Sequence, residues 1–514
     1  MTRPTQPTAL VIIVLAALAF LIAAARLHTY HEPLERDITS AAVIAHEMLG
    51  GRSLYADMWD HKPPAVHITH AVSILLVGLG PGAVYLINVA AAVTTLLGVY
   101  FAAAAVGGLS GGLWGATFWA LISGDLWLQA NQPNAEVFIN ACLVWAFALL
   151  VRASGRPPVR RMLVVGGLFA LASLYKPVAI APAVLLAAAH VIAPPAGCAR
   201  RRAAVDVLLI GGVGAVAWVA TFAHFAVVGH FKDFYQAVFA YNQFYSVNNP
   251  QGSTSIVTNL GVGFRLDTLF PSVLLNALPL ALLSLAGGAR GATAGPGRSW
   301  LLLLSYGIGS QVAVALPGQY FPHYYQLWLP CLTIGAGWAL GSFGSIVRVP
   351  RWVPHAAGAG LVVLMLAEQL PLYQVPPEAW SQLKYGSLFV REQGLGRELG
   401  ALLGPGETFY EWGAETGLYF ESKHSPPSGV FYVFPLLAGP VAQPLAARAV
   451  ADLERHPPVM FVVNSGVLFG GRLRHPILVW AEPRYVRLAG KIDHDPFVLL
   501  VRRGSRLDVS SLAK

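Results

Sequence analysis

The sequence predicts a mainly α-helical membrane protein that crosses the bilayer repeatedly and carries a small α/β domain at its C-terminus. Hydrophobic residues make up 55% of the 514 residues and charged residues only 11%, and the mean hydropathy is +0.58. A soluble domain carries about 25% charged residues, so this chain has too few polar groups to cover a water-facing surface. The apolar residues also gather in runs of roughly 17–25 residues, the length of a membrane-spanning helix.

The apolar runs divide the first three quarters of the chain, residues 1–372. They lie near 9–27, 64–79, 84–105, 109–125, 136–151, 162–175, 177–194, 205–228, 269–287, 299–316, 326–346 and 356–372. The first run is longer than a signal-peptide core and no clear cleavage site follows it, so we interpret it as a retained helix. Clustered glycines interrupt the chain between Gly107 and Gly115, so we expect 109–125 to be a half-spanning or broken segment. About eleven helices then cross the membrane.

Arginine-rich short loops predict the orientation. Residues 152–161 and 200–202 hold such clusters, and loops rich in Lys and Arg stay in the cytoplasm. The N-terminus then lies inside, while the loops 28–63, 127–135, 229–268 and 317–325 and the tail lie outside the cytoplasmic membrane. The net charge of the chain is +9. Because the arginine residues sit in the short loops at 152–161 and 200–202, this charge is explained by membrane orientation and argues against nucleic-acid binding. The three cysteines show no metal-ligand spacing and no disulfide framework.

The tail, residues 385–514, has the composition of a water-soluble domain. Charged residues become frequent and apolar runs shorten. We expect an amphipathic helix at 388–403, a second helix at 446–455, and buried strands at 408–412, 430–434, 459–463 and 497–501. Strands that alternate with helices predict an extracytoplasmic α/β domain.

The first outer loop holds the strongest candidate chemistry. Glu35, Arg36 and Asp37 precede a predicted helix at 38–49, which Gly50 and Gly51 would end. Asp60, His61 and Lys62 precede Pro63 and Pro64, which favour the start of the next helix. A carboxylate takes a proton from a hydroxyl, and a lysine at a helix N-terminus holds phosphate oxygens. Each charge taken singly is better explained as a solvated loop residue, but their convergence favours a site for a hydroxyl acceptor and a phosphate.

Further outer segments add candidates for the same cavity. They contribute Glu136 after Asn134, Lys176 between two apolar runs, Asn242 in the long loop, and His323, Tyr324 and Tyr325 in an aromatic turn. Each has a structural alternative. An acid at a helix start contacts the helix dipole, a lysine at this depth reaches toward the interface, and aromatic residues form interfacial belts.

Taken in order, these segments resemble the bacterial members of the protein mannosyltransferase-like family. This family belongs to the GT-C superfamily of membrane glycosyltransferases, which also contains the lipid A aminoarabinose transferases. The motifs that carry the resemblance are Glu35-Arg36-Asp37, Gly51 with Leu54-Tyr55, Asp60-His61-Lys62-Pro63-Pro64, Asn134-Ala135-Glu136, Tyr175-Lys176-Pro177, Phe321-Pro322-His323-Tyr324-Tyr325-Gln326 and, in the tail, Tyr410-Glu411-Trp412-Gly413.

The resemblance implies an inverting transferase that moves a hexose or pentose from a polyprenyl-phosphate donor to a hydroxyl of a protein, a lipid or an envelope glycan. Asp37 matches the family's first-loop acid, which acts as base or orients the acceptor, and Lys62 matches the lysine that holds the donor phosphate. Glu136 matches a second outer acid, and His323 matches a recurrent residue of the aromatic turn. Lys176 is a second candidate for the phosphate.

One departure from the family concerns the first acid. The family usually has Asp-Glu there, whereas Asp37 is followed by Ile38, and the neighbouring acid is Glu35. Glu35 or Glu136 would have to supply a second carboxylate. We therefore assign no certain cofactor and leave a divalent metal as an alternative.

Two rival functions belong to other classes. A transporter or lipid flippase would be expected to show paired repeats and ionisable groups near the middle of the membrane. The sequence has no internal repeat, and its charged clusters sit at helix ends. A sensor or assembly protein would need no outer-face acid and lysine. The glycosyltransferase hypothesis requires that Asp37 and Lys62 open into one pocket.

Overall fold

The computed structural model describes residues 9–247, 255–265, 277–286, 297–342, 350, 352–468, 475–488 and 495–508. The chain forms two compact units. The first, which we call the helical unit, comprises Met1–Tyr30, Tyr85–His224 and Ser246–Pro376. The second, which we call the mixed unit, comprises His31–Val84, Phe225–Tyr245 and Pro377–Lys514. Each unit therefore draws on segments that lie far apart in the sequence. The predicted boundary between residues 372 and 385 stays a prediction.

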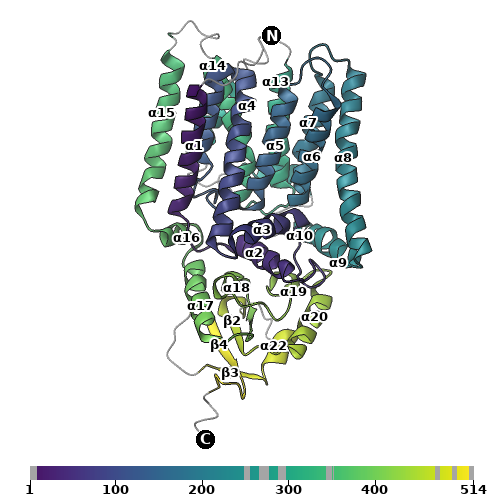
Figure 1. The fold of residues 1–514 in the computed structure, drawn as a ribbon, viewed down its shortest axis with the longest axis vertical. Helices are drawn as coiled ribbons and strands as arrows, with labels where there is room; N and C mark the ends of the chain where they lie inside the picture. The colour runs from purple at the N-terminus through teal and green to yellow at the C-terminus, as the bar shows by residue number, and fades with distance from the viewer. Residues whose placement is uncertain are drawn as a thin grey trace. The chain divides into compact units, whose positions relative to one another are not determined.

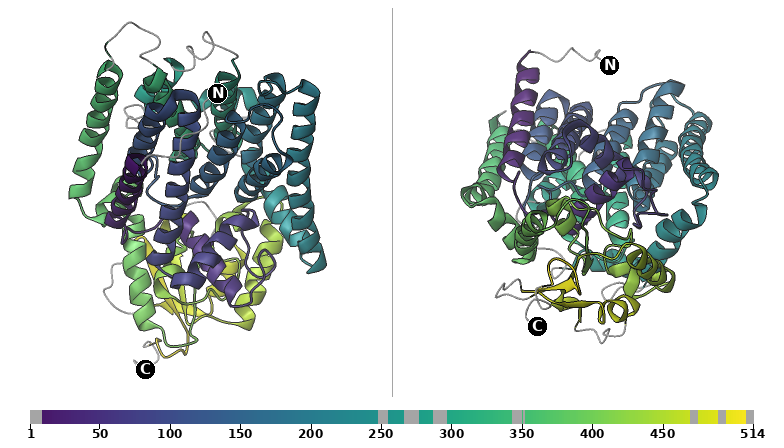
Figure 2. Two further views of the ribbon diagram at one scale, coloured as in Figure 1. Left: turned by 45° about the horizontal axis from the view of Figure 1, so that its top comes forward. Right: turned by 60° about the horizontal axis from the view of Figure 1, so that its bottom comes forward.

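Apolar helices that run side by side make up the helical unit (Figures 1 and 2). They are α1 (Ala9–His28), α4 (Pro81–Ile122), α5 (Ala135–Val151), α6 (Val159–Tyr175), η1 (Pro177–Ala179), α7 (Ile180–Ile192), α8 (Arg200–Val227), α11 (Ile256–Val262), α13 (Arg298–Ala315), η3 (Pro322–Trp328), α14 (Leu329–Ser342), α15 (Trp352–Gln369) and η5 (Leu370–Gln374). Within the described residues, four helices are long and apolar enough to cross a membrane: α1, α4, α8 and α15 with its η5 extension.

The helix α4 contains the interruption that the glycines predict. At Gly108 the backbone leaves the helical region, with φ 67° and ψ −169°. After this break the chain turns back on itself, because Trp119 Nε1 donates to the carbonyl of Ala92 at 2.9 Å. A Cβ on Gly115 would lie 3.0 Å from the Cβ of Ala103. Residues 81–107 and 109–122 are thus the two arms of an antiparallel hairpin, and the second arm is the shorter.

Glycines also allow α4 to meet α14 at backbone distance. A Cβ on Gly107 would lie 2.9 Å from Trp338 Cα, and one on Gly111 would lie 2.9 Å from the carbonyl oxygen of Gly337. Gly341 meets Gly107 in the same way. Spacings of four residues on both helices produce the small-residue interface that is common between membrane helices.

A buried polar cluster connects four helices of the helical unit. Arg298 at the start of α13 donates to the carbonyl oxygens of Ala193 and Leu150, the latter at 2.9 Å, and lies 3.2 Å from His190 Nδ1. His190 of α7 contacts Asp206 of α8 at 3.4 Å. Since Leu150 belongs to α5, this cluster ties α5, α7, α8 and α13 together.

The mixed unit combines short helices with one four-stranded sheet. Its helices are α2 (Arg36–Leu49), α3 (Pro64–Val77), α9 (Phe231–Tyr235), the π-helix η2 (Gln236–Tyr241), α10 (Asn242–Val247), α16 (Pro377–Tyr385), α17 (Leu388–Leu402), α18 (Gly417–Ser422), α19 (Phe434–Leu437), α20 (Ala442–Arg455), α21 (Ser465–Leu468) and α22 (Pro476–Ala481). The strands β1 (Phe409–Trp412), β2 (Met460–Asn464), β3 (Tyr485–Arg487) and β4 (Phe497–Arg502) form a sheet in the order β1-β2-β4-β3. β1 and β2 are parallel, and the other pairs are antiparallel.

The fold class agrees with the sequence prediction, including the C-terminal α/β domain. Helices α17 and α20 and strands β1, β2 and β4 occur where they are expected. The predicted strand at 430–434 is wrong: the buried residues 430–433 form an irregular segment, and Phe434 is the first residue of α19, followed by Pro435. Strand β3 has only three residues and was not predicted.

Helices α2 and α3 position the candidate site. α2 ends at Leu49 as predicted, with Gly51 at a φ of 96°, which suits glycine. Pro64 is the first residue of α3, where a missing N–H costs no hydrogen bond. The predicted spanning run at 64–79 thus becomes a helix of 14 residues that packs on α2 within the mixed unit.

Candidate functional site

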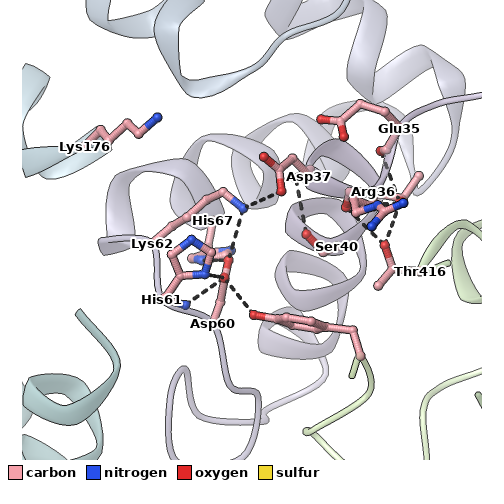
Figure 3. Close-up of polar contacts among 12 residues, drawn as sticks. Glu35, Arg36, Asp37, Ser40, Asp60, His61, Lys62, His67, Lys176 and Thr416 are labelled. Atoms are coloured by element: carbon pink, nitrogen blue, oxygen red, sulfur yellow. Dashed lines mark hydrogen bonds and ion pairs between the residues drawn. The ribbon is translucent and has the colours of Figure 1, made fainter. Parts of the chain in front are cut away.

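The first turn of α2 and the residues before α3 bring Asp37 and Lys62 together. Asp37 is the second residue of α2, and Lys62 precedes the two prolines that start α3. The Lys62 ammonium lies 3.2 Å from Asp37 Oδ1 (Figure 3). The Asp37 side chain is 39% exposed and that of Lys62 15%. The predicted acid and the predicted lysine therefore form an ion pair that solvent reaches from the Asp37 side.

Asp60 is a second, buried counter-ion for the same lysine. Its Oδ2 lies 3.9 Å from Lys62 Nζ, and its side chain is 1% exposed. The His61 backbone N–H donates to Asp60 Oδ1 at 2.7 Å, and the His67 ring lies 3.2 Å from Asp60 Oδ2. Burial alone would raise the pKa of Asp60, but Lys62 and the two histidines hold that pKa well below its ordinary value. Asp60 is thus a permanent anion beneath the exposed ion pair.

Glu35 is the other predicted acid, and its surroundings favour the protonated form. Burial and the neighbouring Asp37 carboxylate raise the pKa of Glu35 to about 8, against the opposing effect of Lys62 and Arg36. Glu35 therefore carries a proton at neutral pH. The surroundings of Glu35, chiefly its burial, therefore favour the neutral form of this acid.

The backbone on which Lys62 sits is held from two sides. The Tyr55 hydroxyl donates to the Lys62 carbonyl at 2.8 Å, and the Tyr55 ring packs against Phe225 and Phe234. Tyr55 has a φ of 68°, a left-handed conformation that is uncommon outside glycine. The Asn242 side chain donates to the His61 carbonyl at 2.8 Å. Asn242 thus lies beside the site, where it contacts backbone.

Tail residues enclose the start of α2. Arg36 lies 3.8 Å from the buried carboxylate of Glu415, and its guanidinium covers the rings of Phe389 and Phe434. The Thr416 hydroxyl donates to the Arg36 carbonyl at 3.1 Å (Figure 3). The residue that precedes Asp37 is therefore fixed through both its side chain and its backbone.

A second polar group lies in the helical unit. Glu136 in the first turn of α5 accepts a hydrogen bond from Lys176 Nζ at 2.8 Å. The same ammonium lies 3.5 Å from the centre of the Tyr324 ring, a cation–π contact. Lys176 interrupts the helical path between α6 and η1. The charge of Lys176 is thus shared between a carboxylate and an aromatic face.

The remaining residues of the aromatic turn play unequal parts. His323 Nδ1 contacts Gln129 Oε1 at 2.9 Å. Tyr325 is 1% exposed and its hydroxyl donates to the Gly263 carbonyl at 3.0 Å, which is a packing role. Tyr324 contacts Lys176 through its ring.

Sequence reasoning missed four residues that contact the site: His67, Glu415, Thr416 and Tyr432, whose hydroxyl donates to Asp60 Oδ1 at 3.2 Å. His67 was hidden in an apolar run, although it lies one turn after the start of α3. Thr416 and Tyr432 come from the tail, and no local pattern connects them to the first outer loop. Among the described residues, no group of three or more His, Cys, Asp and Glu side chains is arranged to hold a metal ion.

The class of fold is that of the GT-C membrane glycosyltransferases. The structure of ArnT from Cupriavidus metallidurans bound to undecaprenyl phosphate is similar to this chain, with a TM-score of 0.61 at 15% identity over 96% of this chain and 98% of that one. AglB, the oligosaccharyltransferase of Archaeoglobus fulgidus, solved with an inhibitory peptide and a dolichol-phosphate, gives 0.53 at 13% identity over 97% and 74%. The arabinofuranosyltransferase AftD from Mycobacteria gives 0.50 at 14% identity over 95% of this chain and 40% of that one.

These identities show a shared fold and nothing more specific. No protein-family model matches the sequence, and no curated protein matches it. The likeness of the coordinates is to the fold that the resemblance in the motifs implies.

Proposed function

We propose that this protein is a membrane glycosyltransferase that moves a sugar from a polyprenyl-phosphate donor to a hydroxyl acceptor with inversion at the anomeric carbon. The observation that carries the proposal is the exposed Asp37–Lys62 ion pair above the buried Asp60. The fold supports it, since similar structures were solved with undecaprenyl phosphate and with a dolichol-phosphate.

Lys62 binds the donor phosphate in this proposal. Its ammonium has two carboxylate partners, of which Asp60 is buried and Asp37 is exposed. An incoming phosphate replaces the exposed partner, and Asp60 remains as the fixed counter-ion. The N-terminus of α3, two residues further on, adds a favourable field for an anion. Lys176, which shares its charge with Glu136, is our second candidate for the phosphate.

Asp37 acts as the base. Once the phosphate occupies Lys62, the Asp37 carboxylate is free to take the proton of the acceptor hydroxyl. The hydroxyl oxygen attacks the anomeric carbon from the side opposite the phosphate, the bond from that carbon to the phosphate oxygen breaks, and polyprenyl phosphate leaves with the electron pair. Glu35 is unsuited to this task because its pKa of about 8 keeps it protonated at neutral pH. It limits the negative charge beside Asp37.

The location of the reaction is also part of the proposal. The distribution of the arginine-rich loops supports a candidate site at the outer face of the cytoplasmic membrane. A lipid-linked donor suits that side, where nucleotide sugars are absent. The acceptor class and the choice between hexose and pentose are left open.

The test uses the full chain in lipid nanodiscs with a radiolabelled polyprenyl-phosphate sugar. Asp37→Asn should bind the donor and lose about 10²–10⁴-fold in the transfer rate, the usual cost of a general base. Lys62→Met should lose donor binding itself. Asp495→Asn is the matched control, since this exposed tail carboxylate pairs with Arg391. Full turnover by a well-folded Asp37→Asn chain would remove the proposed base.

The same nanodisc preparation separates the transporter or flippase alternative. A transferase breaks the bond between sugar and phosphate, so free polyprenyl phosphate accumulates. A flippase reconstituted in vesicles changes only the side on which the intact lipid-linked sugar is found. Movement of intact donor without release of polyprenyl phosphate would favour that alternative.

A further inference from the structure

We infer that the C-terminal tail positions both halves of the site: Tyr432 positions Lys62 through Asp60, and Glu415 with Thr416 positions Asp37 through the first turn of α2. This inference rests on the proposed function and gives the tail a role in it. All the residues involved belong to the mixed unit.

Tyr432 contacts Asp60 directly and is packed beside Trp59. Its hydroxyl donates to Asp60 Oδ1 at 3.2 Å, and its ring lies 5.9 Å from that of Trp59 between centroids. Nearby, the Trp59 backbone N–H donates to the carbonyl of Gly429 at 3.0 Å. A Cβ on Gly429 would collide with the Asp57 carbonyl, so only glycine permits this approach of the two backbones.

A second contact fixes the same junction. Arg448 of α20 donates to the carbonyl of Asp57 at 2.7 Å and to that of Tyr55 at 3.2 Å. Two other neighbours of Asp60, His61 and His67, come from the same stretch of chain as Lys62. Tyr432 therefore supplies a reference point for Asp60 that lies outside that stretch.

The second connection runs from the sheet to Asp37. Asn464 at the end of β2 donates to Glu415 Oε2 at 2.9 Å, and the Ala414 N–H donates to the same oxygen at 3.0 Å. The other Glu415 oxygen faces Arg36 at 3.8 Å. Glu415 is only 2% exposed, so this arrangement has little freedom to change.

Thr416 completes the connection at the backbone. Its hydroxyl donates to the Arg36 carbonyl at 3.1 Å and lies 2.7 Å from the hydroxyl of Thr39. The Arg36 carbonyl belongs to the peptide group that continues into Asp37. Fixing this peptide fixes the direction in which the Asp37 carboxylate leaves α2.

The two connections should have different kinetic signatures. Tyr432 acts on the group that binds the donor phosphate, so its loss should raise the KM for the donor and leave kcat nearly unchanged. Thr416 acts on the base, so its loss should lower kcat and leave the donor KM nearly unchanged. A tail that only stabilises the fold would change both constants together with the melting temperature.

The experiment measures kcat, the donor KM and the melting temperature of full-length variants in nanodiscs with a polyprenyl-phosphate sugar. Tyr432→Phe should raise the donor KM roughly tenfold, the effect of one hydrogen bond to a charged group. Thr416→Val should lower kcat by a similar factor, and Thr416→Ser, which keeps the hydroxyl, should restore it. Tyr485→Phe is the matched control, because it removes a buried tail hydrogen bond to the Pro458 carbonyl, 2.7 Å long, away from the site.

Three results would overturn the inference. One is an active wild type whose Tyr432→Phe and Thr416→Val variants keep both constants. Another is that each variant raises the donor KM and lowers kcat together, and that Tyr485→Phe, at the same melting temperature as these variants, does the same. The third is a wild type that neither binds nor consumes the donor, which rejects the proposed function as well; the first two reject the inference alone.

Discussion

Lys62 lies between two carboxylates that differ in solvent exposure, since Asp37 is partly exposed and Asp60 is buried. This difference determines which carboxylate a ligand can replace. Asp60 is held by buried neighbours, so exchanging it for a phosphate would leave an unpaired buried anion, which costs several kcal/mol. Asp37 is partly solvated and is lost from the pair at lower cost. We therefore propose that a ligand anion enters at the Asp37 side.

Glu35 should govern the alkaline limb of activity. Its pKa of about 8 keeps it neutral at pH 7, and its ionisation above that pH adds a negative charge near Asp37 and Lys62 that opposes phosphate binding. We expect the kcat/KM of the wild type for the donor to fall above about pH 8. Glu35→Gln, which keeps a neutral side chain, should match the wild type at pH 7 and stay level through that region.

The stability of the folded protein should also depend on the protonation of Glu35, and it should decrease as the pH rises. Between the ordinary carboxyl pKa of 4.5 and about 8, folded Glu35 holds a proton that the unfolded chain has released. The linkage relation then makes the wild type less stable as the pH rises through this window. Melting curves at several pH values compare wild type with Glu35→Gln, in which this contribution is absent. An unchanged pH slope in the variant would contradict the assignment.

Individual site residues were predictable only where local sequence carries them. Asp37 and Lys62 stand beside helix starts, so a turn pattern and a charge suffice to select them, and the structure brings them together. Tyr432 was assigned to a strand because the residues around it are apolar and β-branched or aromatic. Its contact with Asp60 joins residues 372 positions apart, and no single-sequence pattern reports such a pairing.

Among the secondary-structure elements, the glycine contact of α4 with α14 is the most sensitive to volume. Gly337 lies so close to the backbone of Gly111 that a Cβ would overlap it. Gly337→Ala should lower the melting temperature of the protein in detergent by several degrees, because a backbone cannot give way as a flexible side chain does.

The control for this substitution is Gly360→Ala on α15. A Cβ there would meet no atom within 4 Å. Alanine also favours the helix by about 1 kcal/mol over glycine, so this variant should be as stable as the wild type or more so. Equal melting temperatures for the two variants would show that the α4–α14 contact tolerates a methyl group.

Element types were easier to predict than their uses. The apolar runs and the caps at Gly51 and Pro64 are local signals, and the helices begin and end near them. The same hydropathy cannot say which run joins which unit. α3 has the composition of a spanning helix, yet its partner is α2, because Ala71 and Ile74 pack against Ala45.

At the scale of the whole helical unit, replacing Arg298 should lower the stability of the packing between several helices. Arg298 satisfies two backbone carbonyls and contacts a buried histidine that pairs with Asp206. Arg298→Met leaves these groups without their donor, which costs about 1–3 kcal/mol for each buried acceptor left unsatisfied. A lower melting temperature in nanodiscs, measured by intrinsic fluorescence, is the expected result.

Arg200→Met provides the comparison. Arg200 also donates to a carbonyl, that of Ile192, but through an exposed contact of 3.4 Å. Its removal should change stability by less than about 1 kcal/mol. If Arg298→Met and Arg200→Met have the same melting temperature, the buried cluster around Arg298 does not stabilise the packing of α5, α7, α8 and α13.

Composition alone was enough to predict the membrane class, since 11% charged residues cannot cover a soluble protein of this size. The division into units was not predictable. It depends on contacts such as Thr39 with Thr416, which connect the first outer loop with the tail across most of the chain. Long-range pairing of this kind is determined by packing and leaves no periodic trace.

The mixed unit is assembled from residues 31–84, 225–245 and 377–514. Ribosomes deliver these segments in that order, and domains fold as their parts emerge. Asp37 and Lys62 are therefore translated early but must wait for Thr416 and Tyr432 to arrive. The proposed catalytic centre of a nascent chain would remain unfinished until Tyr432 has been translated, so termination before that residue should yield inserted but inactive protein.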